Sequence, residues 1–413
     1  MASTKRNRTP SNAPRQQSPL GSFLRSPIQS SVAMFDRYFL HQSPLFYRLA
    51  MLVLLLVGFG LISVQSSSNV VEIKNGGNPF GGFGQQLLYA VVGLGFLVFF
   101  STRSIDWLES VSKLALYAAG AVQLLVKVPG VGVSVGGNTN WIRIFGFTVQ
   151  PSEFLKLGLV LYLSHILAKH KDELWDFQTG PKQVMMFGFG SAALVYLTSF
   201  DMGTAIIFVV IVLGMSYLAG MPAVHFNKFL ILTAVGGMIG IASSGSRRDR
   251  ILALFMPGSA NSDGLDWQSR HGIWALANGG LFGVGPGNST LNWGWIPEVE
   301  NDFIFANIAE EWGMLGALVV IVAFFLLGKW IRNIAQNSND SFGSLVAIGV
   351  MLWVLMQALI NISVVLNILP VLGVPLPLIS KGGSSIVAVL MALGVVLAVE
   401  RVQAPARSGV RAK

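Results

Sequence analysis

The chain of 413 residues is 53% hydrophobic and only 11% charged. Soluble domains carry roughly 25% charged residues, so this composition, with its several long apolar blocks, indicates a polytopic membrane protein. The sequence contains no cysteine, which excludes disulfides, thiolate chemistry and Cys-ligated metals. Its net charge is +9, yet the basic residues lie mostly in the tails and between the apolar blocks. We attribute this charge to membrane topology and expect no nucleic-acid binding.

The first stretch, residues 1–45, is rich in Ser, Pro, Asn, Gln and Arg and poor in aliphatic residues. It cannot bury enough apolar surface to offset its ordering entropy, so we expect a disordered basic tail on the cytoplasmic side. No apolar core closely follows its first charges, which is unlike a signal peptide. It is either a solvated tail that fixes orientation or a docking segment for a cytoplasmic partner. Residues 403–413 form a second, short basic tail.

Between the tails, residues 46–402 are interpreted as one all-α membrane domain of about ten transmembrane helices. Placing both termini in the cytoplasm gives the inside segments more than twice as many Lys and Arg residues as the outside segments, as the positive-inside rule requires. The apolar segments are centred near residues 57, 93, 121, 162, 192, 211, 236, 320, 356 and 392.

The longest connection, residues 244–302, lies outside the membrane in this topology, between the seventh and eighth spans. It holds the glycine-rich stretch "NGGLFGVGPGN", from Asn278 to Asn288, which by itself is typical of a flexible linker. A solvated linker rarely carries several tryptophans, and this connection contains Trp267, Trp274, Trp293 and Trp295. We therefore expect a folded or re-entrant element that rests on the membrane surface.

The stretch "QPSEFLKLG" opens the fourth span. Pro151 suits the first position of a helix, and Ser152 is a candidate cap. Glu153 and Lys156 lie three residues apart on one face of that helix. They form either a buried ion pair that joins two helices or an oriented pair that lines a polar cavity, because ionisable residues inside membranes often mark functional sites.

Two further polar stretches border predicted spans. Asp201 lies between the fifth and sixth spans, either as the N-cap of the sixth or as a site residue. Three prolines and three glycines interrupt the apolar region from Asn367 to Ser385. Irregular backbone at membrane depth requires protein or water to satisfy its polar groups, so we expect a broken, re-entrant segment lining a cavity. Lys381, beside two glycines, either meets an anion at a helix N-terminus or is an interface lysine.

The stretch "WIPEVENDFIFANIAEEWGMLG" contains Glu298, Glu300, Asp302, Glu310 and Glu311. We expect Glu298 and Glu300 to lie in water with a solvating role. Asp302 directly precedes an apolar run, where water ends, and desolvation there makes a carboxylate a better proton acceptor near neutral pH. Glu310 and Glu311 point about 100° apart on a helix, so one of them is expected to be structural.

These stretches resemble elements of the SEDS family (shape, elongation, division and sporulation), in the same order along the chain. The resemblance covers nearly all of the chain after residue 45. Its elements are "WIRIFGFTVQPSEFLKL", "FDMGT", "NGGLFGVGPGNS", "IPEVENDFIFANIAEEWGMLG" and "LPVLGVPLPLISKGGSS". Members of this family polymerise lipid II into the glycan strands of peptidoglycan on the outer face of the cytoplasmic membrane. They work beside a class B penicillin-binding transpeptidase.

The resemblance implies a peptidoglycan glycosyltransferase with Asp302 as its general base. Asp302 would deprotonate the 4-hydroxyl of the acceptor sugar, and undecaprenyl pyrophosphate would leave the donor with inversion. The pyrophosphate leaves best when cations neutralise it. The candidate cations are Arg143, Lys156 and Lys381, with a divalent Mg²⁺ or Mn²⁺ as a further candidate. The other positions expected to bind substrate are Glu153, Asp201, Glu310 and Ser384.

The sequence departs from the family pattern at several positions. Asn140 stands where a basic residue is frequent, Phe200 where Pro is usual, and Asn301 where Thr is common. Lys381 stands where Tyr is common, so its role is inferred from this chain alone. The five histidines form no predicted ligand cluster, and no protein metal site is expected from them.

The basic, Ser- and Pro-rich tail is more typical of the FtsW-like division branch of the family than of the RodA-like elongation branch. It favours septal synthesis and contacts with cytoplasmic division proteins. A lipid II flippase and a scaffold that only recruits the transpeptidase are alternative functions that would use the same cavity. The acid at the edge of the membrane, Asp302, favours chemistry.

Overall fold

The computed structural model describes residues 40, 42–74, 76–135, 138–144, 146–255, 265–293 and 299–407. Residues Ser43–Lys413 form one compact unit. The predicted N-terminal tail lies almost entirely outside the described residues, as do Glu298 and Trp295. The tail's disorder and its docking role therefore stay predictions.

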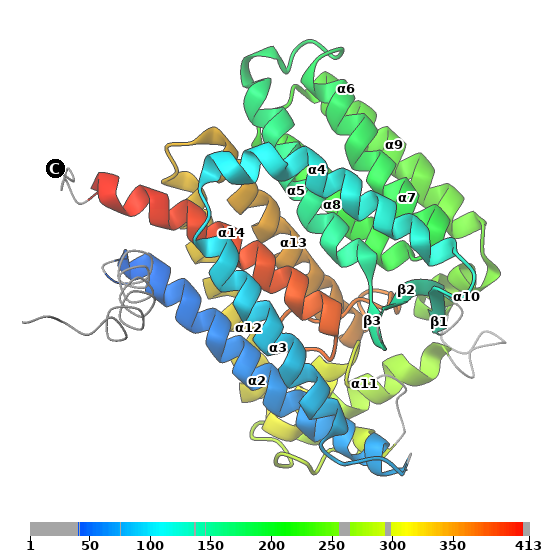
Figure 1. Cartoon of the computed structure of the whole chain (residues 1–413). Helices are drawn as coiled ribbons and strands as arrows, with labels where there is room; N and C mark the ends of the chain where they lie inside the picture. Colours follow the sequence, from blue (N-terminus) through cyan, green and yellow to red (C-terminus); the bar gives the residue numbers. More distant parts are fainter. Residues whose placement is uncertain are drawn as a thin grey trace, which may run out of the picture. The chain divides into compact units, whose positions relative to one another are not determined.

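The described part of the unit is built almost entirely of helices (Figure 1). Its membrane-domain helices are α2 (Pro44–Lys74), α3 (Gly81–Ser101), α4 (Ile105–Leu124), α5 (Pro151–Lys169), α6 (Gly180–Val184), the π-helix η3 (Met185–Phe189), α7 (Gly190–Ser199), α8 (Met202–Leu218), α9 (Ala223–Ala242), α12 (Ile304–Gln336), α13 (Ser341–Val365) and α14 (Gly383–Arg407). The connection between α9 and α12 contains α10 (Gly245–Phe255) and α11 (Leu265–Gly279). The all-α prediction is confirmed.

Among the described residues, six helices are long and apolar enough to cross a membrane: α2, α3, α9, α12, α13 and α14. The chain is therefore a multi-pass membrane protein. Every predicted apolar centre falls inside a helix, although α4 begins and ends earlier than the centre near residue 121 suggests. The first half of α4 carries Asp106, Glu109 and Lys113, which displaced the apolar window toward its C-terminal end. The number of spans stays a prediction.

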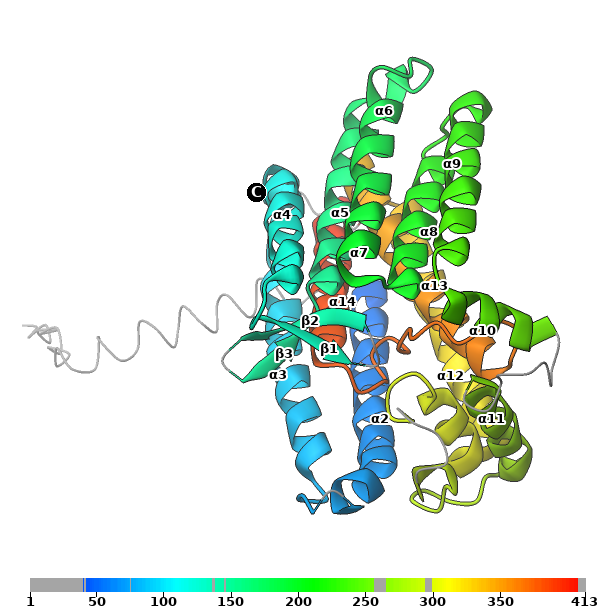
Figure 2. The same cartoon turned by 90° about the vertical axis from the view of Figure 1, so that its right-hand side faces the viewer.

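The helices pack in two groups around a shared centre. Figures 1 and 2 show α2, α3 and α14 side by side, and α4, α5, α7, α8 and α9 together. The helix α13 packs against both groups and against α12. Small residues let α3 and α14 approach closely, because a Cβ at Gly394 would lie 2.6 Å from the carbonyl oxygen of Leu97. Of the six membrane-length helices in the described residues, α14 is the most enclosed, with 83% of its apolar window buried.

A small antiparallel sheet, which the sequence analysis did not predict, connects α4 to α5. Its strands are β1 (Gly132–Val135), β2 (Asn138–Ile144) and β3 (Phe147–Val149), in the order β1-β2-β3. The turn between β2 and β3 contains Gly146 with φ +85°, a conformation that favours glycine. The β-branched and aromatic residues of β2 suit a strand, but the stretch is short and lies between helices. The sheet carries polar side chains to the candidate site.

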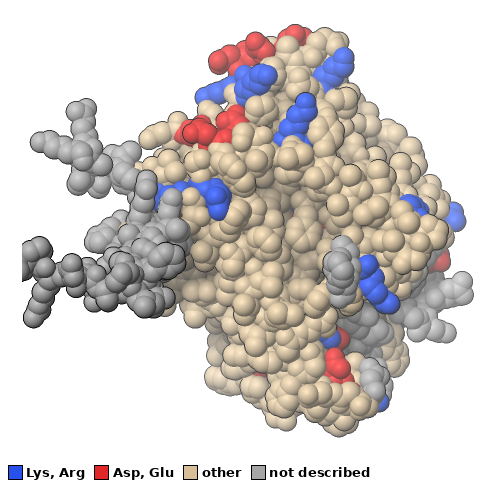
Figure 3. Space-filling model, viewed as in Figure 1, with Lys and Arg blue, Asp and Glu red and all other residues tan. Residues whose placement is uncertain are grey.

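Large apolar side chains are exposed along the spans, including Met51, Leu54, Val91, Ile231 and Val319. In Figure 3, the charged side chains lie toward the edges of the visible face and leave a broad uncharged surface between them. In water, apolar patches of this kind mark interaction sites. In a protein with several membrane-length helices, this surface faces lipid.

Candidate active site

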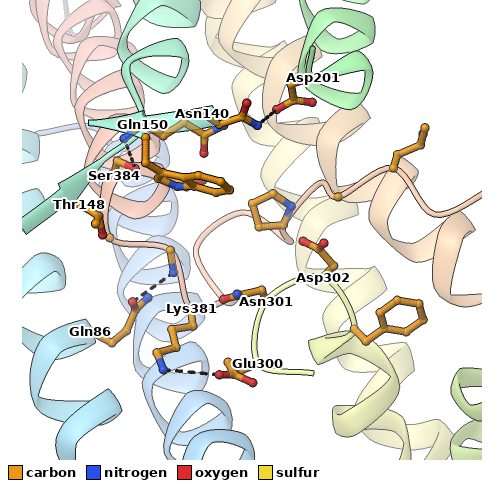
Figure 4. Close-up of a pocket in the computed structure, with 18 of the residues that line it drawn as sticks. Gln86, Asn140, Thr148, Gln150, Asp201, Glu300, Asn301, Asp302, Lys381 and Ser384 are labelled. Carbon is orange, nitrogen blue, oxygen red and sulfur yellow. Dashed lines mark hydrogen bonds and ion pairs between the residues drawn. The ribbon is translucent and has the colours of Figure 1, made fainter. Parts of the chain in front are cut away.

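A cavity of about 650 Å³ lies where several irregular segments meet. Figure 4 shows its walls, which come from α3, β2, α10, the turn before α12, and the segment between α13 and α14. Its polar lining residues include Gln86, Asn140, Thr148, Gln150, Asp201, Arg250, Glu300, Asn301, Asp302, Lys381, Ser384 and Ser385. Of the predicted site residues, the structure thus brings together Asp201, Asp302, Lys381 and Ser384.

The predicted broken segment is present as non-helical backbone from residue 366 to 382, between α13 and α14. Two side chains of α13 satisfy carbonyl groups of this backbone, as irregular backbone at membrane depth requires. Gln357 Nε2 donates to the Pro375 oxygen at 3.1 Å, and Asn361 Nδ2 donates to the Val374 oxygen at 2.8 Å. The re-entrant segment, as we call residues 366–382, lines the cavity with Val371, Leu372, Gly373, Pro375 and Lys381 among others.

Asp302 lies in the turn that leads into α12 and lines the cavity beside the re-entrant segment (Figure 4). A Cβ at Gly373 would lie 3.7 Å from Asp302 Oδ2, so the carboxylate lies next to the main chain of Gly373. The expectation that Asp302 stands at the edge of a polar site fits this position. Its role as a base stays a prediction.

Arg250 of α10 is a cavity cation that the sequence analysis missed. Its Nη1 donates to the Val371 oxygen at 3.0 Å, which joins α10 to the re-entrant segment. Burial lowers the pKa of Arg250 and the charge of Arg247 lowers it further, whereas the negative charge of Asp302 raises it. The guanidinium stays charged at neutral pH and is electrostatically coupled to Asp302. The sequence analysis gave Arg250 no role, because it treated this basic residue only as part of the long outside connection, residues 244–302.

Lys381 is held between two carboxylates. Its Nζ lies 3.5 Å from Glu300 Oε1 and 3.7 Å from Glu72 Oε1. The expectation that Glu300 only solvates the loop is therefore wrong, because its side chain is 12% exposed, pairs with Lys381 and lines the cavity. The chain folds back at this point, so two residues 81 positions apart in sequence meet, and no local pattern reports that contact.

Asp201 is both an N-cap and a cavity residue. It accepts hydrogen bonds from Thr204 N at 2.8 Å and from Thr204 Oγ1 at 2.7 Å at the start of α8. This confirms the predicted N-cap. Asn140 Nδ2 of β2 donates to Asp201 Oδ2 at 2.7 Å, the same oxygen that accepts from Thr204 Oγ1.

Ser384 stands at the N-terminus of α14, where its Oγ accepts from Gln150 N at 3.1 Å. Gly382 N, two residues earlier, donates to Gln86 Oε1 at 3.3 Å. The N-terminal end of α14, with its partial positive charge, therefore points toward the cavity with Lys381 beside it.

The Glu153–Lys156 pair lies behind the cavity wall. Lys156 Nζ is 2.8 Å from Glu153 Oε1 and donates to Gln357 Oε1 of α13 at 2.9 Å. Both side chains are 2% exposed, and neither is among the described lining residues. The pair thus joins α5 to α13, as in the structural alternative. Pro151 is at the first helical position as predicted, but Gln150 is the N-cap, so the capping role proposed for Ser152 is wrong.

Arg143 and Glu310 are also absent from the described cavity lining. Arg143 is exposed on β2. Glu310 is buried and accepts hydrogen bonds from Asn278, Ser289 and Thr290, so it anchors the glycine-rich connection instead of facing the cavity. Glu311 accepts from Ser66 Oγ, which also makes it structural in this conformation.

The glycine-rich stretch from Asn278 to Asn288, called the glycine-rich connection below, is folded, as expected. It pairs its backbone with a break in α12 at Gly313, where φ is +68° and ψ is −169°. Val284 N donates to the Glu310 oxygen at 3.0 Å, and Met314 N donates to the Gly280 oxygen at 2.9 Å. A Cβ at Gly313 would lie 2.4 Å from Gly283 N, so only glycine fits. The main-chain groups released by the break are thus satisfied by this connection.

Within the described residues, no group of three or more His, Cys, Asp or Glu side chains converges as a metal site. A cage made by the protein alone therefore does not fit the described part of the cavity. Hard divalent cations in phosphate chemistry often use only one or two carboxylates together with substrate phosphates.

These features define a multi-pass helical membrane protein with a polar cavity, closed by a re-entrant segment and a broken helix. The family model of FtsW, RodA and SpoVE, described as cell cycle protein, matches residues 47–404. The chain belongs to this family, the SEDS family.

Curated relatives agree. Stage V sporulation protein E of Bacillus subtilis is 35% identical over 356 residues, which cover 86% of this chain and 96% of the relative. The probable peptidoglycan glycosyltransferase FtsW of Mycobacterium tuberculosis is 34% identical over 373 residues, which cover 89% of this chain and 70% of the relative.

Solved structures share the fold. A peptidoglycan synthase complex, solved to describe the coordination of polymerization and crosslinking, contains a chain that matches with a TM-score of 0.72 and 25% identity, covering 88% of this chain and 99% of that one. The rod shape determining protein RodA of Thermus thermophilus matches with a TM-score of 0.64 and 24% identity, covering 88% and 98%.

Proposed function

We propose that this protein is a peptidoglycan glycosyltransferase that polymerises lipid II. The observation that carries the proposal is that Asp302, Arg250 and Lys381 share one cavity. A carboxylate beside cations is the arrangement that a glycosyl transfer with a diphosphate leaving group needs. The relatives named FtsW support the same reaction class.

In the proposed reaction, Asp302 takes the proton from the 4-hydroxyl of the acceptor sugar. That oxygen forms a bond to the anomeric carbon of the donor, and the bond from this carbon to the pyrophosphate oxygen breaks. The leaving undecaprenyl pyrophosphate carries the electron pair away, with inversion at the anomeric carbon. Arg250 and Lys381 would stabilise its negative charge, and the N-terminal end of α14 near Ser384 would add hydrogen-bond donors.

This assignment replaces two of the predicted cations. Arg143 and Lys156 lie outside the described lining, whereas Arg250 lies on the cavity and is coupled to Asp302. We propose that Mg²⁺ or Mn²⁺ would be held mainly by the pyrophosphate, with a cavity carboxylate such as that of Asp201 nearby. Such a cation would add positive charge at the leaving group.

We further propose an outward-facing cavity, cytoplasmic termini, and action at the division septum beside a class B transpeptidase. The excess of Lys and Arg in the inside segments supports the orientation. Several relatives named FtsW and the fold match to a peptidoglycan synthase complex support the division branch and the partner. The RodA-like branch shares the fold, so the branch is tested by localisation of the tagged protein in cells.

The reaction is tested with full-length protein in vesicles, with and without a class B transpeptidase, and labelled lipid II. We expect glycan chains from the wild type and none from Asp302→Asn. The matched control is Asp340→Asn, because Asp340 caps α13 through Gly343 N and asparagine caps equally well. Polymer from Asp302→Asn would remove Asp302 as the base. Lipid II that crosses the vesicle membrane without any polymer would support the flippase instead.

A further inference from the structure

Three consecutive carbonyl groups in the turn that carries Asp302 each accept one hydrogen bond. Lys381 N donates to the Glu300 oxygen at 2.9 Å, and Ser380 Oγ donates to the Asn301 oxygen at 2.6 Å. Asn361 Nδ2 donates to the Asp302 oxygen at 2.8 Å. We call these three donors the carbonyl clamp. The turn has no helix or sheet ladder of its own, so these bonds fix its position relative to the re-entrant segment.

The two side chains of the clamp also fix the re-entrant segment. Asn361 Nδ2 donates to the Val374 oxygen at 2.8 Å, and Ser380 Oγ accepts from Leu376 N at 2.8 Å. Each side chain thus contacts both walls of the cavity at once. Asn361 is 1% exposed and Ser380 is 4% exposed, and neither is among the described lining residues. They therefore act on the cavity from behind its surface.

We infer that Asn361 and Ser380 are positioning residues that hold the Asp302 carboxylate at a fixed place against the re-entrant segment. The inference rests on the proposed role of Asp302 as the base. A base must stay within hydrogen-bond reach of the proton it removes, and a displacement of about 1 Å can cost roughly 100-fold in rate. Removing a clamp donor releases a carbonyl next to Asp302 or at Asp302 itself, so the carboxylate loses its fixed position.

The clamp predicts a specific kinetic change. Because Asn361 and Ser380 do not line the described cavity, their removal leaves lipid II binding intact and lowers the chemical step. The kcat falls about tenfold or more while KM changes by less than about twofold. The acidic limb of the pH–rate profile, which reports protonation of the base, moves as the surroundings of Asp302 change.

The test uses full-length protein in vesicles with its class B transpeptidase. The variants are Ser380→Ala, which removes a single oxygen atom, Asn361→Leu, and Ser380→Thr, which keeps the hydroxyl and restores kcat. The matched control is Ser164→Ala. Ser164 is a buried serine of α5 whose Oγ donates to the Val160 oxygen, and its loss leaves kcat and the pH profile unchanged. Rates are normalised to folded protein by thermal unfolding.

The outcomes separate the two proposals. Wild-type kcat and an unmoved pH profile in both Ser380→Ala and Asn361→Leu, with Asp302→Asn inactive, overturn the clamp and leave the proposed reaction in place. A lower unfolding temperature with unchanged kcat per folded molecule shows a purely structural role and also overturns it. Polymer formed by Asp302→Asn instead overturns the proposed base, and the clamp inference fails with it.

Discussion

Asn140 Nδ2 donates to Asp201 Oδ2 at 2.7 Å, which joins strand β2 to the start of α8 on the cavity wall. The family resemblance led us to expect a basic residue at position 140, whereas this chain makes the contact with Asp201 through a neutral amide. The carboxylate is buried, at 6% exposure, so each of its partners matters.

Asn140→Leu therefore leaves Asp201 with fewer partners and should lower the stability of the protein by about 1–3 kcal/mol. Asn140→Arg should keep the connection as a charge-assisted hydrogen bond and retain the wild-type unfolding temperature. Thermal unfolding in detergent measures both variants. Equal unfolding temperatures for Asn140→Leu and the wild type would show that the bond to Asp201 is not needed.

Arg250→Gln should reduce polymerisation strongly, because it removes a cavity cation coupled to Asp302. Arg250→Lys should retain part of the activity, since it keeps the charge but loses the planar geometry of the guanidinium. The measurement is the initial rate of polymerisation and its inhibition by inorganic pyrophosphate, which should weaken in Arg250→Gln. The control is Arg248→Gln, because Arg248 is exposed on the same helix and outside the described lining. Equal loss in both variants would argue for a general charge effect.

Lys156→Met should destabilise the protein by about 3–5 kcal/mol, because it leaves the buried carboxylate of Glu153 without its cation. The double variant Glu153→Gln with Lys156→Met should recover most of that loss. The comparison pair is His170–Glu173, where Glu173 is 60% exposed, and Glu173→Gln should cost less than about 1 kcal/mol. Thermal unfolding reports all of them, and a double variant less stable than Lys156→Met would contradict the argument.

Gly313→Ala should disrupt the break in α12, because the added Cβ would lie 2.4 Å from Gly283 N at a positive φ. We expect loss of folded protein or faster proteolysis of the connection before α12. The matched change is Gly236→Ala in α9, where no described atom lies within 4 Å of the new Cβ and alanine favours the helix. Limited proteolysis and yield of folded protein measure both. A stable, protease-resistant Gly313→Ala would show that α12 can close over its break.

The sequence predicted the features whose cause is local. The long apolar runs indicated the helices, and the prolines and glycines near Leu376 indicated the broken segment. The apolar run that directly follows Asp302 indicated that this acid lies where water ends. The cavity cation Arg250 was missed because its partner, Val371, is 121 positions away. The clamp bonds from Asn361 and Ser380 span 59 and 79 positions, and spacing patterns record only neighbours.

The sheet was missed for a different reason. A seven-residue strand such as β2 is too short to outweigh the long helices that flank it. Glu300 was assigned to water from its place at the end of the outside connection, whereas in the structure it pairs with Lys381 of the re-entrant segment.

Between Gly280 and Gly285, the glycine-rich stretch is attached to α12 through main-chain atoms, such as Val284 N to the Glu310 oxygen. The side chains of Leu281 and Phe282, 55% and 80% exposed, take no part in those bonds. These two outward side chains can therefore be replaced without loss of those main-chain bonds, provided that Gly283 and Gly313 are kept. Substitutions at Leu281 and Phe282 should therefore leave the attachment to α12 in place.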